Sequence, residues 1–493
     1  MAATARLRAR LISRVEPDGA VRDPCHSRVL ESALLFALLE RTRLEPAVRR
    51  RVAAYLTGHC DSPILLDRLL ARSALGRREP AADVLDVERF LARAPSFTGA
   101  RKRTFLHAVL LLLGAAPGTA WPGADAFDLR GLHTWARVQV TAVKAVLAHA
   151  HRLPHLIEAA DLDLLVSTQR PGTVWEGNLL IHLSVLHALA PLPGYQQLVS
   201  GGIRTALEHQ RPDGGMPFIC DEDTWVTATA GVALHAAGAP TPVLDAIAGR
   251  LLRLQQPGGG WSCTEQAELA DVDCTSVAIE VLHAAGPEIH RAPITRALGF
   301  LHALRGRDGG FPTYLAGAPS EACMTAAAAN ALSAQGPRQH ATLEAALSHL
   351  ASQQQPDGTF PPDWSSSRLH TVFRASLAAR HHPATPHPAV PPGTSSGAPF
   401  DLSRSRRTLT AGGASRTEPT ATPSAPPTPS SPSAPTPRPR PPPGAPPTCS
   451  PVSALTGPST ASPTRSGRAP SASPFPRSPT LSPSWRSGTS PTT

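Results

Sequence analysis

The sequence lacks the features that mark disulfide-linked, secreted and membrane-spanning proteins. Its seven cysteines are odd in number and scattered, and no Cys-x-x-Cys pair occurs, which indicates a reduced protein without a disulfide framework. The basic N-terminus has no apolar stretch like that of a signal peptide, and the longest apolar run, near residues 108–116, is too short to cross a bilayer. We therefore expect a cytoplasmic protein without a transmembrane segment, and we leave peripheral contact with a membrane open.

A basic stripe or motif for nucleic-acid binding is also lacking in residues 1–382, although the formal net charge of the chain is +10. Residues 383–493 hold ten arginines against two acidic residues, which leaves a charge of about +2 for the rest. This last segment is dominated by Pro, Ser, Thr, Ala, Gly and Arg, so we expect a disordered tail there. A frameshift in a GC-rich gene is a second hypothesis for its origin. We expect no nucleic-acid partner.

What the sequence does contain is an internal repeat of about 50 residues. Four glycine-rich turns, at 213–215, 258–260, 308–310 and 357–359, each lie between two Ala- and Leu-rich stretches with helical periodicity. Glycine supplies the positive φ that such turns need. An apolar residue follows each turn, and these four residues are Met216, Trp261, Phe311 and Phe360. The pattern predicts repeated αα-hairpins.

The repeat also suggests how the chain is divided. A fifth, weaker copy begins at residues 169–175, and the preceding part of the chain has helical patterns without a clear repeat. We expect an N-terminal helical domain at 1–160, a repeat domain at 161–382 and the tail at 383–493.

The turn at 258–260 lies in the sequence QQPGGGW (residues 255–261), and this sequence resembles a known motif. It is similar to the QW motif of the superfamily that contains squalene cyclases, class II terpene cyclases and protein prenyltransferase β-subunits. The resemblance implies an all-α fold, an α/α barrel in which inner helices line a cavity and outer helices surround it.

One residue breaks the repeat. When the second helices of the four units are aligned, Asp273 occupies a position that holds Trp225, Cys323 or Leu369 in the other units. A carboxylate on an apolar face has a desolvation cost, and no cationic partner is close in sequence. An exception to an internal pattern is where a functional residue is expected, so Asp273 is our candidate for the active site.

The residues around Asp273 support a second resemblance. Asp271-Val272-Asp273-Cys274-Thr275 resembles the Asp-x-Asp-Asp-Thr motif of class II terpene cyclases, in which the middle Asp is the general acid. Cys274 replaces the last Asp, as in the Asp-Cys-Thr sequence of oxidosqualene cyclases. The resemblance implies that Asp273 protonates an alkene of a linear prenyl substrate, while Asp271, Cys274 and Thr275 tune its acidity.

The chemistry of such a reaction sets requirements that the sequence meets. An alkene is a very weak base, so the donor must be a protonated carboxylic acid, and burial together with the neighbouring Asp271 would keep Asp273 protonated. The resulting carbocation needs aromatic faces around it, for which Trp225 and Tyr314 are our substrate-binding candidates. Aromatic residues make up only 4% of the chain. This scarcity favours a C15 or C20 prenyl diphosphate, such as geranylgeranyl diphosphate, over squalene as the source of a cyclic terpenoid.

The sequence also bears on cofactors and on two alternative functions. The sequence has no Asp-Asp-x-x-Asp motif, so ionisation of a diphosphate by bound metals is not expected, and no metal ligand is assigned. Family resemblance suggests Mg²⁺ bound with a retained diphosphate, and no organic cofactor. One alternative is a zinc enzyme like the prenyltransferase β-subunits, although the Asp-x-Cys spacing of their ligands is absent at Cys274. A helical-repeat binding protein without catalytic activity is the other alternative.

Overall fold

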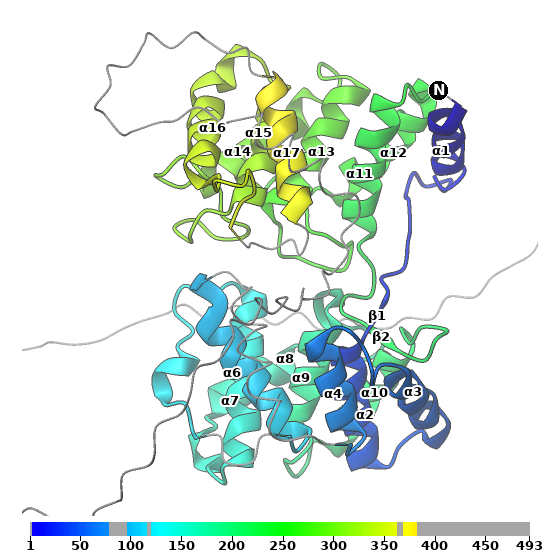
Figure 1. The fold of residues 1–493 in the computed structure, drawn as a ribbon, viewed down its shortest axis with the longest axis vertical. Helices are drawn as coiled ribbons and strands as arrows, with labels where there is room; N and C mark the ends of the chain where they lie inside the picture. The colour runs from blue at the N-terminus through cyan, green and yellow to red at the C-terminus, as the bar shows by residue number, and fades with distance from the viewer. Residues whose placement is uncertain (1, 78–95, 116–119, 362–367, 382–493) are drawn as a thin grey trace, which may run out of the picture. The chain divides into compact units, whose positions relative to one another are not determined.

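The computed structural model describes residues 2–77, 96–115, 120–361 and 368–381 (Figure 1). These residues are almost entirely helical, and one short antiparallel pair joins β1 (Ser27–Arg28) to β2 (Met216–Pro217). The all-α class expected from the repeats is therefore confirmed. None of the described helices is long and apolar enough to cross a membrane. The expected tail at 383–493 falls outside the described residues.

Helices from residues 29–220 enclose a first hydrophobic core. Helix α9 is buried along its whole length, which explains why its sequence, LLIHLSVLHAL, has no polar face. The helices of this core are α2 (Val29–Thr42), α3 (Pro46–Gly58), α4 (Leu65–Ala74), α6 (Ser96–Leu112), α7 (Thr134–Ala150), α8 (Ala159–Ser167), α9 (Leu179–Leu189) and α10 (Gln196–Leu207). Three short 3-10 helices accompany them, η1 (Ala124–Phe127), η2 (Pro154–Leu156) and η3 (Trp175–Gly177).

Helices from residue 223 onward form a second core as two layers of hairpins (Figure 1). The inner helices contact one another in the order α11 (Asp223–Ala236), α13 (Val272–Ala285), α15 (Ala322–Ser333) and α17 (Arg368–His381). The outer helices are α12 (Thr241–Leu254), α14 (Arg291–Leu304) and α16 (His340–Gln353), the last preceded by η4 (Pro337–Gln339). These paired layers confirm the hairpin architecture expected of an α/α barrel. Helix α1 (Ala2–Ile12) also belongs here, because it packs against α11.

Five turns among the described residues share one hydrogen-bond pattern. In each turn the first residue donates its N–H to the carbonyl of the fifth, at 2.8–3.0 Å, and the fourth residue donates back to the first. The fourth residue is always a glycine with φ between 83° and 91°. The five turns span residues 16–20, 211–215, 256–260, 306–310 and 355–359. Of these five turns, only the first, with the sequence EPDGA, is not part of the repeat seen in the sequence.

These turns fasten each hairpin to the next. A Cβ on Gly259 would lie 2.4 Å from the carbonyl oxygen of Arg296 in α14, so only glycine allows this close approach. The next inner helix receives a hydrogen bond as well, because the N–H of Trp261 donates to Thr275 Oγ1 at 3.0 Å. The equivalent bond from Phe311 to Thr325 is 2.9 Å long.

The order of attachment differs from the order of the chain. The turn at 211–215 docks on α2 and α3, where the N–H of Met216 donates to Ser32 Oγ at 2.9 Å, and not on α11, which follows it in sequence. Instead α11 receives the turn at 16–20 through Val21, whose N–H donates to Thr227 at 2.9 Å. The first core is thus inserted between a turn and the helix that this turn binds. The domain boundary at residue 160 stays a prediction. The two hydrophobic cores favour a domain boundary near residue 220.

Candidate active site

Asp273 is the second residue of helix α13, and local capping explains why the helix begins there. Asp271 adopts an extended conformation as the N-cap, and its side chain accepts the N–H of Cys274 at 2.7 Å. The N–H of Asp271 donates to the carbonyl of Trp261 at 2.9 Å, which joins the helix start to the glycine turn. Thr275 accepts the N–H of Trp261, as described above. Asp271 and Thr275 therefore shape the helix start that presents Asp273.

The carboxylate of Asp273 is held by side chains from two other inner helices. Trp225 on α11 donates its indole Nε1–H to Oδ2 at 3.0 Å. Arg374 on α17 donates from Nη2 to Oδ1 at 3.2 Å, which makes an ion pair. The side chain of Asp273 is 16% exposed and that of Arg374 only 7%. The structure thus brings together two of the predicted site residues, Asp273 and Trp225, and adds an arginine.

Arg374 is a cationic partner of Asp273 that the sequence did not suggest. The arginine lies 101 positions further along the chain, so nearness in sequence could not reveal it. A signal was nevertheless present in the repeat. Three residues after Thr227, Thr275 and Thr325 the inner helices carry alanine, whereas three residues after Thr371 the chain has Arg374. Arg374, like Asp273, is thus an exception to the internal pattern of the repeat.

Asp271 is buried, and its surroundings favour the neutral form. Burial raises its pKa to about 7, the nearby Asp273 raises it further, and hydrogen bonds from the backbone and thiol of Cys274 oppose the rise. The thiol of Cys274 therefore interacts with Asp271. The predicted tuning of Asp273 by these two residues stays a prediction.

Tyr314 lies in an aromatic group beside Asp271. Its ring centroid is 4.6 Å from that of His133 and 6.1 Å from that of Trp135, both at the start of α7. Burial, followed by the charge of Asp271, raises the pKa of the Tyr314 hydroxyl far above its usual range. Burial lowers the pKa of His133 to about 4, so this imidazole is neutral at pH 7. The second predicted aromatic residue thus lies near Asp271, together with two side chains that the sequence did not suggest.

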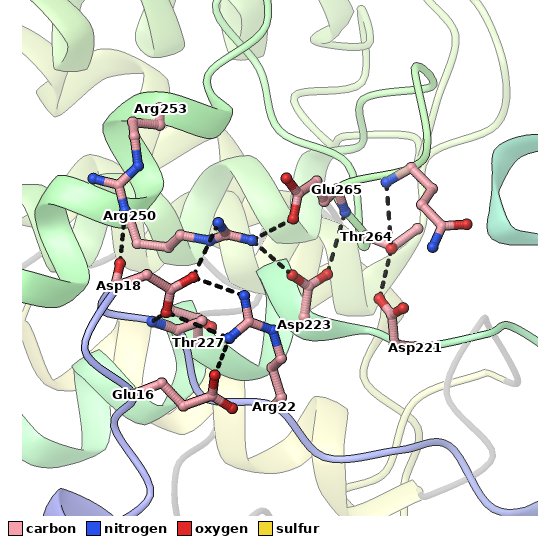
Figure 2. A network of polar contacts seen from close by, with 12 residues as sticks. Glu16, Asp18, Arg22, Asp221, Asp223, Thr227, Arg250, Arg253, Thr264 and Glu265 are labelled. Carbon is pink, nitrogen blue, oxygen red and sulfur yellow. Dashed lines mark hydrogen bonds and ion pairs between the residues drawn. The ribbon is translucent and has the colours of Figure 1, made fainter.

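An ionic network around the buried Arg250 holds the loop that leads to Asp271 from one side (Figure 2). Arg250 of α12 bonds to Asp223 at 3.2 Å, to Asp18 at 3.3 Å and also to Glu265. The backbone N–H of Glu265 donates to Asp223 at 3.2 Å. Figure 2 shows these groups converging on the guanidinium of Arg250. The N-terminal turn, the start of α11 and the loop before α13 are therefore tied together.

The same loop is held from the first core by Glu176. This buried carboxylate accepts the indole N–H of Trp135 at 3.0 Å and the backbone N–H of Glu268 at 2.8 Å. Glu176 has a φ of 56°, an uncommon backbone conformation for a non-glycine residue. The loop before Asp271 is thus held at Glu265 by Asp223 and at Glu268 by Glu176.

Two known proteins resemble the chain over most of its length, and both are class II terpene cyclases; the chain therefore belongs to this family. The first, the drimenyl diphosphate synthase of Streptantibioticus cattleyicolor, is 39% identical over 406 residues, covering 79% of this chain and 74% of the relative. The second, the drimenyl diphosphate synthase of Streptomyces showdoensis, is 38% identical over 391 residues, with coverage of 76% and 72%. No protein-family model matches the chain. Membership in a family of enzymes sets aside the zinc-enzyme and binding-protein alternatives.

Solved structures with detectable likeness are more distant. The ent-copalyl diphosphate synthase of Streptomyces platensis is 19% identical, with a TM-score of 0.42 and coverage of 84% of this chain and 93% of that one. A type II terpene cyclase from Scytonema, in complex with geranylgeranyl dihydroxybenzoate, is 14% identical, with a TM-score of 0.25 and coverage of 73% and 80%.

Proposed function

We propose that this chain cyclises a C15 prenyl diphosphate, farnesyl diphosphate, by protonating its terminal alkene from Asp273. The names of the two relatives denote a C15 bicyclic product that keeps its diphosphate, which favours C15 over C20 within the expected range. The observation that carries the proposal is the carboxylate of Asp273, which Trp225 and Arg374 hold between three inner helices.

The contacts of Asp273 suit the two halves of a proton transfer. The proton leaves the carboxyl group for the alkene carbon that yields the more substituted cation, and internal alkenes then attack in turn to close the rings. Loss of a proton from a carbon next to the last cation restores a double bond, so the diphosphate stays attached. The carboxylate left on Asp273 is stabilised by the guanidinium of Arg374 and the indole N–H of Trp225.

The diphosphate of the substrate needs cationic partners, and α6 supplies two. Burial lowers the pKa of His133, and the charge of Arg101 lowers it further, so Arg101 lies close to the imidazole that contacts the ring of Tyr314. Burial and the same arginine lower the pKa of Lys102. We assign the diphosphate to Arg101 and Lys102. Their replacement by glutamine should raise KM for the diphosphate substrate more than it lowers kcat.

Mg²⁺ remains a prediction from family resemblance. Among the described residues, no group of three or more His, Cys, Asp or Glu side chains could hold a metal ion. We therefore derive no step through a protein-bound metal. A magnesium ion coordinated mainly by the diphosphate and water would need few protein ligands. Removal of free Mg²⁺ with a chelator should then raise KM. Full activity in the presence of the chelator would show that the reaction does not need Mg²⁺.

A product assay tests the proposed function directly. Wild-type protein and Asp273→Asn would be incubated with farnesyl diphosphate, geranylgeranyl diphosphate and squalene, and products would be identified by mass spectrometry after dephosphorylation. We expect a bicyclic C15 alcohol from the wild type, which disappears in the variant because an amide cannot supply the proton. The same product from Asp273→Asn would refute the assignment of the acid. A cyclic product from geranylgeranyl diphosphate alone would change the substrate to C20.

A further inference from the structure

A second buried carboxylate lies beside Arg374. Glu280 is on α13, two helical turns after Asp273, and its side chain is only 18% exposed. Its Oε1 is 3.8 Å from Nη2 of Arg374, and this oxygen has no hydrogen-bond partner among the described residues. One guanidinium nitrogen thus lies between two carboxylates that belong to the same helix.

The electrostatics of this arrangement explain why a second carboxylate is useful. A general acid must hold its proton until the substrate arrives, but the positive charge of Arg374 favours the ionised form of Asp273. A negative charge at Glu280 offsets that effect, since it neutralises the guanidinium and repels a second anion at Asp273. The pKa of Glu280 is itself raised to about 7 by burial, with Arg374 lowering it and Asp273 raising it. The two carboxyl groups therefore act on each other through space.

We propose that Glu280 is a positioning residue that balances the charge of Arg374, so that Asp273 keeps its proton until the substrate binds. Arg374 then stabilises the carboxylate that the proton leaves behind. The inference rests on the proposed function, because it concerns the same acid.

The groups that face this triad come from several helices. From α17, Arg374 contacts both carboxylates, and its backbone carbonyl accepts the side-chain amide of Asn330 on α15 at 3.0 Å. From the start of α11, Glu222 lies near enough to Asp273 for their charges to interact. Among the described residues, the charged groups that act on Glu280 are Arg374 and Asp273. On α13 itself, the charge of Asp271 also acts on Asp273. The balance of charge at the acid therefore sets Arg374 against three carboxylates, Glu280, Glu222 and Asp271.

The pH dependence of kcat/KM distinguishes this role from a structural one. Loss of the proton from Asp273 gives the profile its alkaline limb. Glu280→Gln removes the balancing charge, so the limb should move to lower pH by about one unit, with about tenfold lower activity on the alkaline side of the limb and recovery at acid pH. Arg374→Gln should move the limb to higher pH and lower kcat, because the carboxylate product loses its partner. Opposite shifts from two neighbouring substitutions are not expected from damage to packing.

Two further variants complete the test. Glu280→Asp restores the charge and should return the limb most of the way, whereas a shift as large as that of Glu280→Gln would assign the effect to packing and overturn the proposal. Glu288→Gln removes the same charge from an exposed side chain and should leave the profile unchanged.

The outcomes separate the inference from the proposed function. An unshifted limb in Glu280→Gln, or a rate lowered equally at all pH values, would overturn the inference about Glu280. If Asp273→Asn were inactive in the same experiments, Asp273 would still be the general acid. An active Asp273→Asn would instead overturn the proposed function. Thermal melting of each variant would show that the profiles compare folded proteins.

Discussion

Helices α2 and α13 receive the same kind of glycine turn but carry different chemistry. On α2 the hydroxyl that accepts the N–H after the turn belongs to Ser32, and on α13 it belongs to Thr275. Two residues before these hydroxyls the chain has Leu30 in the first core and Asp273 in the second. Leu30 is buried among apolar side chains, whereas Asp273 meets a tryptophan and an arginine. One substitution at a repeated position separates a packing residue from a candidate acid.

The residue directly before the hydroxyl also differs between the two cores, but here the carboxylate lies in the first core. In the second core it holds Cys274, and in the first it holds Glu31, whose carboxylate is completely buried. Burial raises the pKa of Glu31, and the nearest cation that acts on it is Arg28, at 3.7 Å. A buried carboxylate near a glycine turn is therefore not sufficient for a site. The turn determines how hairpins attach, and the identity of the residues around the hydroxyl determines function.

The largest expected effects separate Asp273 from Leu30. Asp273→Asn should lower activity by about 10²–10⁴-fold while the free energy of unfolding changes little, because the amide can still accept the indole N–H of Trp225. Leu30→Ala should do the opposite, with a loss of about 2–5 kcal/mol of stability and unchanged specific activity of the folded fraction. Denaturant unfolding and product assays would measure both. Equal losses of activity in the two variants would show that Leu30 and Asp273 do not differ in function.

Next in size are substitutions in the turns themselves. Gly259→Ala should lower the free energy of unfolding by about 2 kcal/mol or more, since its φ is 91° and the new Cβ would meet the carbonyl of Arg296. Gly214→Ala should cost a similar amount in the first core, where the carbonyl of Arg51 lies 2.7 Å away. Gly258→Ala is the matched control, because a Cβ there meets nothing within 4 Å. An unchanged free energy of unfolding in Gly214→Ala would show that the two turns are not equivalent.

The turns also show what the sequence could and could not predict. Helical hairpins, Asp273 and Trp225 were all accessible, because each belongs to a pattern that recurs about every 50 residues along the chain. Arg374 and the docking of the turn at 211–215 on α2 were missed, since both depend on contacts between segments more than 100 residues apart. The turn at 16–20 was missed because valine follows it where the other turns are followed by Met, Trp or Phe. Local periodicity predicts elements, but it does not say which element a turn will bind.

A smaller effect is expected at the paired hydroxyls. Thr275→Val and Ser32→Ala each leave a buried backbone N–H without its acceptor, which should lower the free energy of unfolding by about 1–3 kcal/mol in both cores. Thr275→Val should also lower kcat, because the bond it removes fixes the start of α13 two residues after the acid. Ser32→Ala should leave kcat unchanged. Unfolding curves and steady-state rates would check this difference, and a drop in kcat from Ser32→Ala would contradict it.

The last expected effect concerns the dependence of stability on pH at Asp271. Its pKa in the folded protein is raised to about 7 from 3.8, so the folded state holds this proton more tightly than the unfolded chain. The stabilisation is therefore complete below pH about 4 and is lost as the pH rises through about 7. Asp271→Asn can still cap α13 but cannot ionise, so it should be more stable than wild type at alkaline pH, by about 1 kcal/mol or more, and similar in acid.

Melting temperatures across this range would measure the difference, with Asp61→Asn, an exposed aspartate, as the control. A gap between wild type and Asp271→Asn that stays constant with pH would mean that Asp271 is already ionised in the folded protein, and the two carboxylates at the start of α13 would then differ only in their partners.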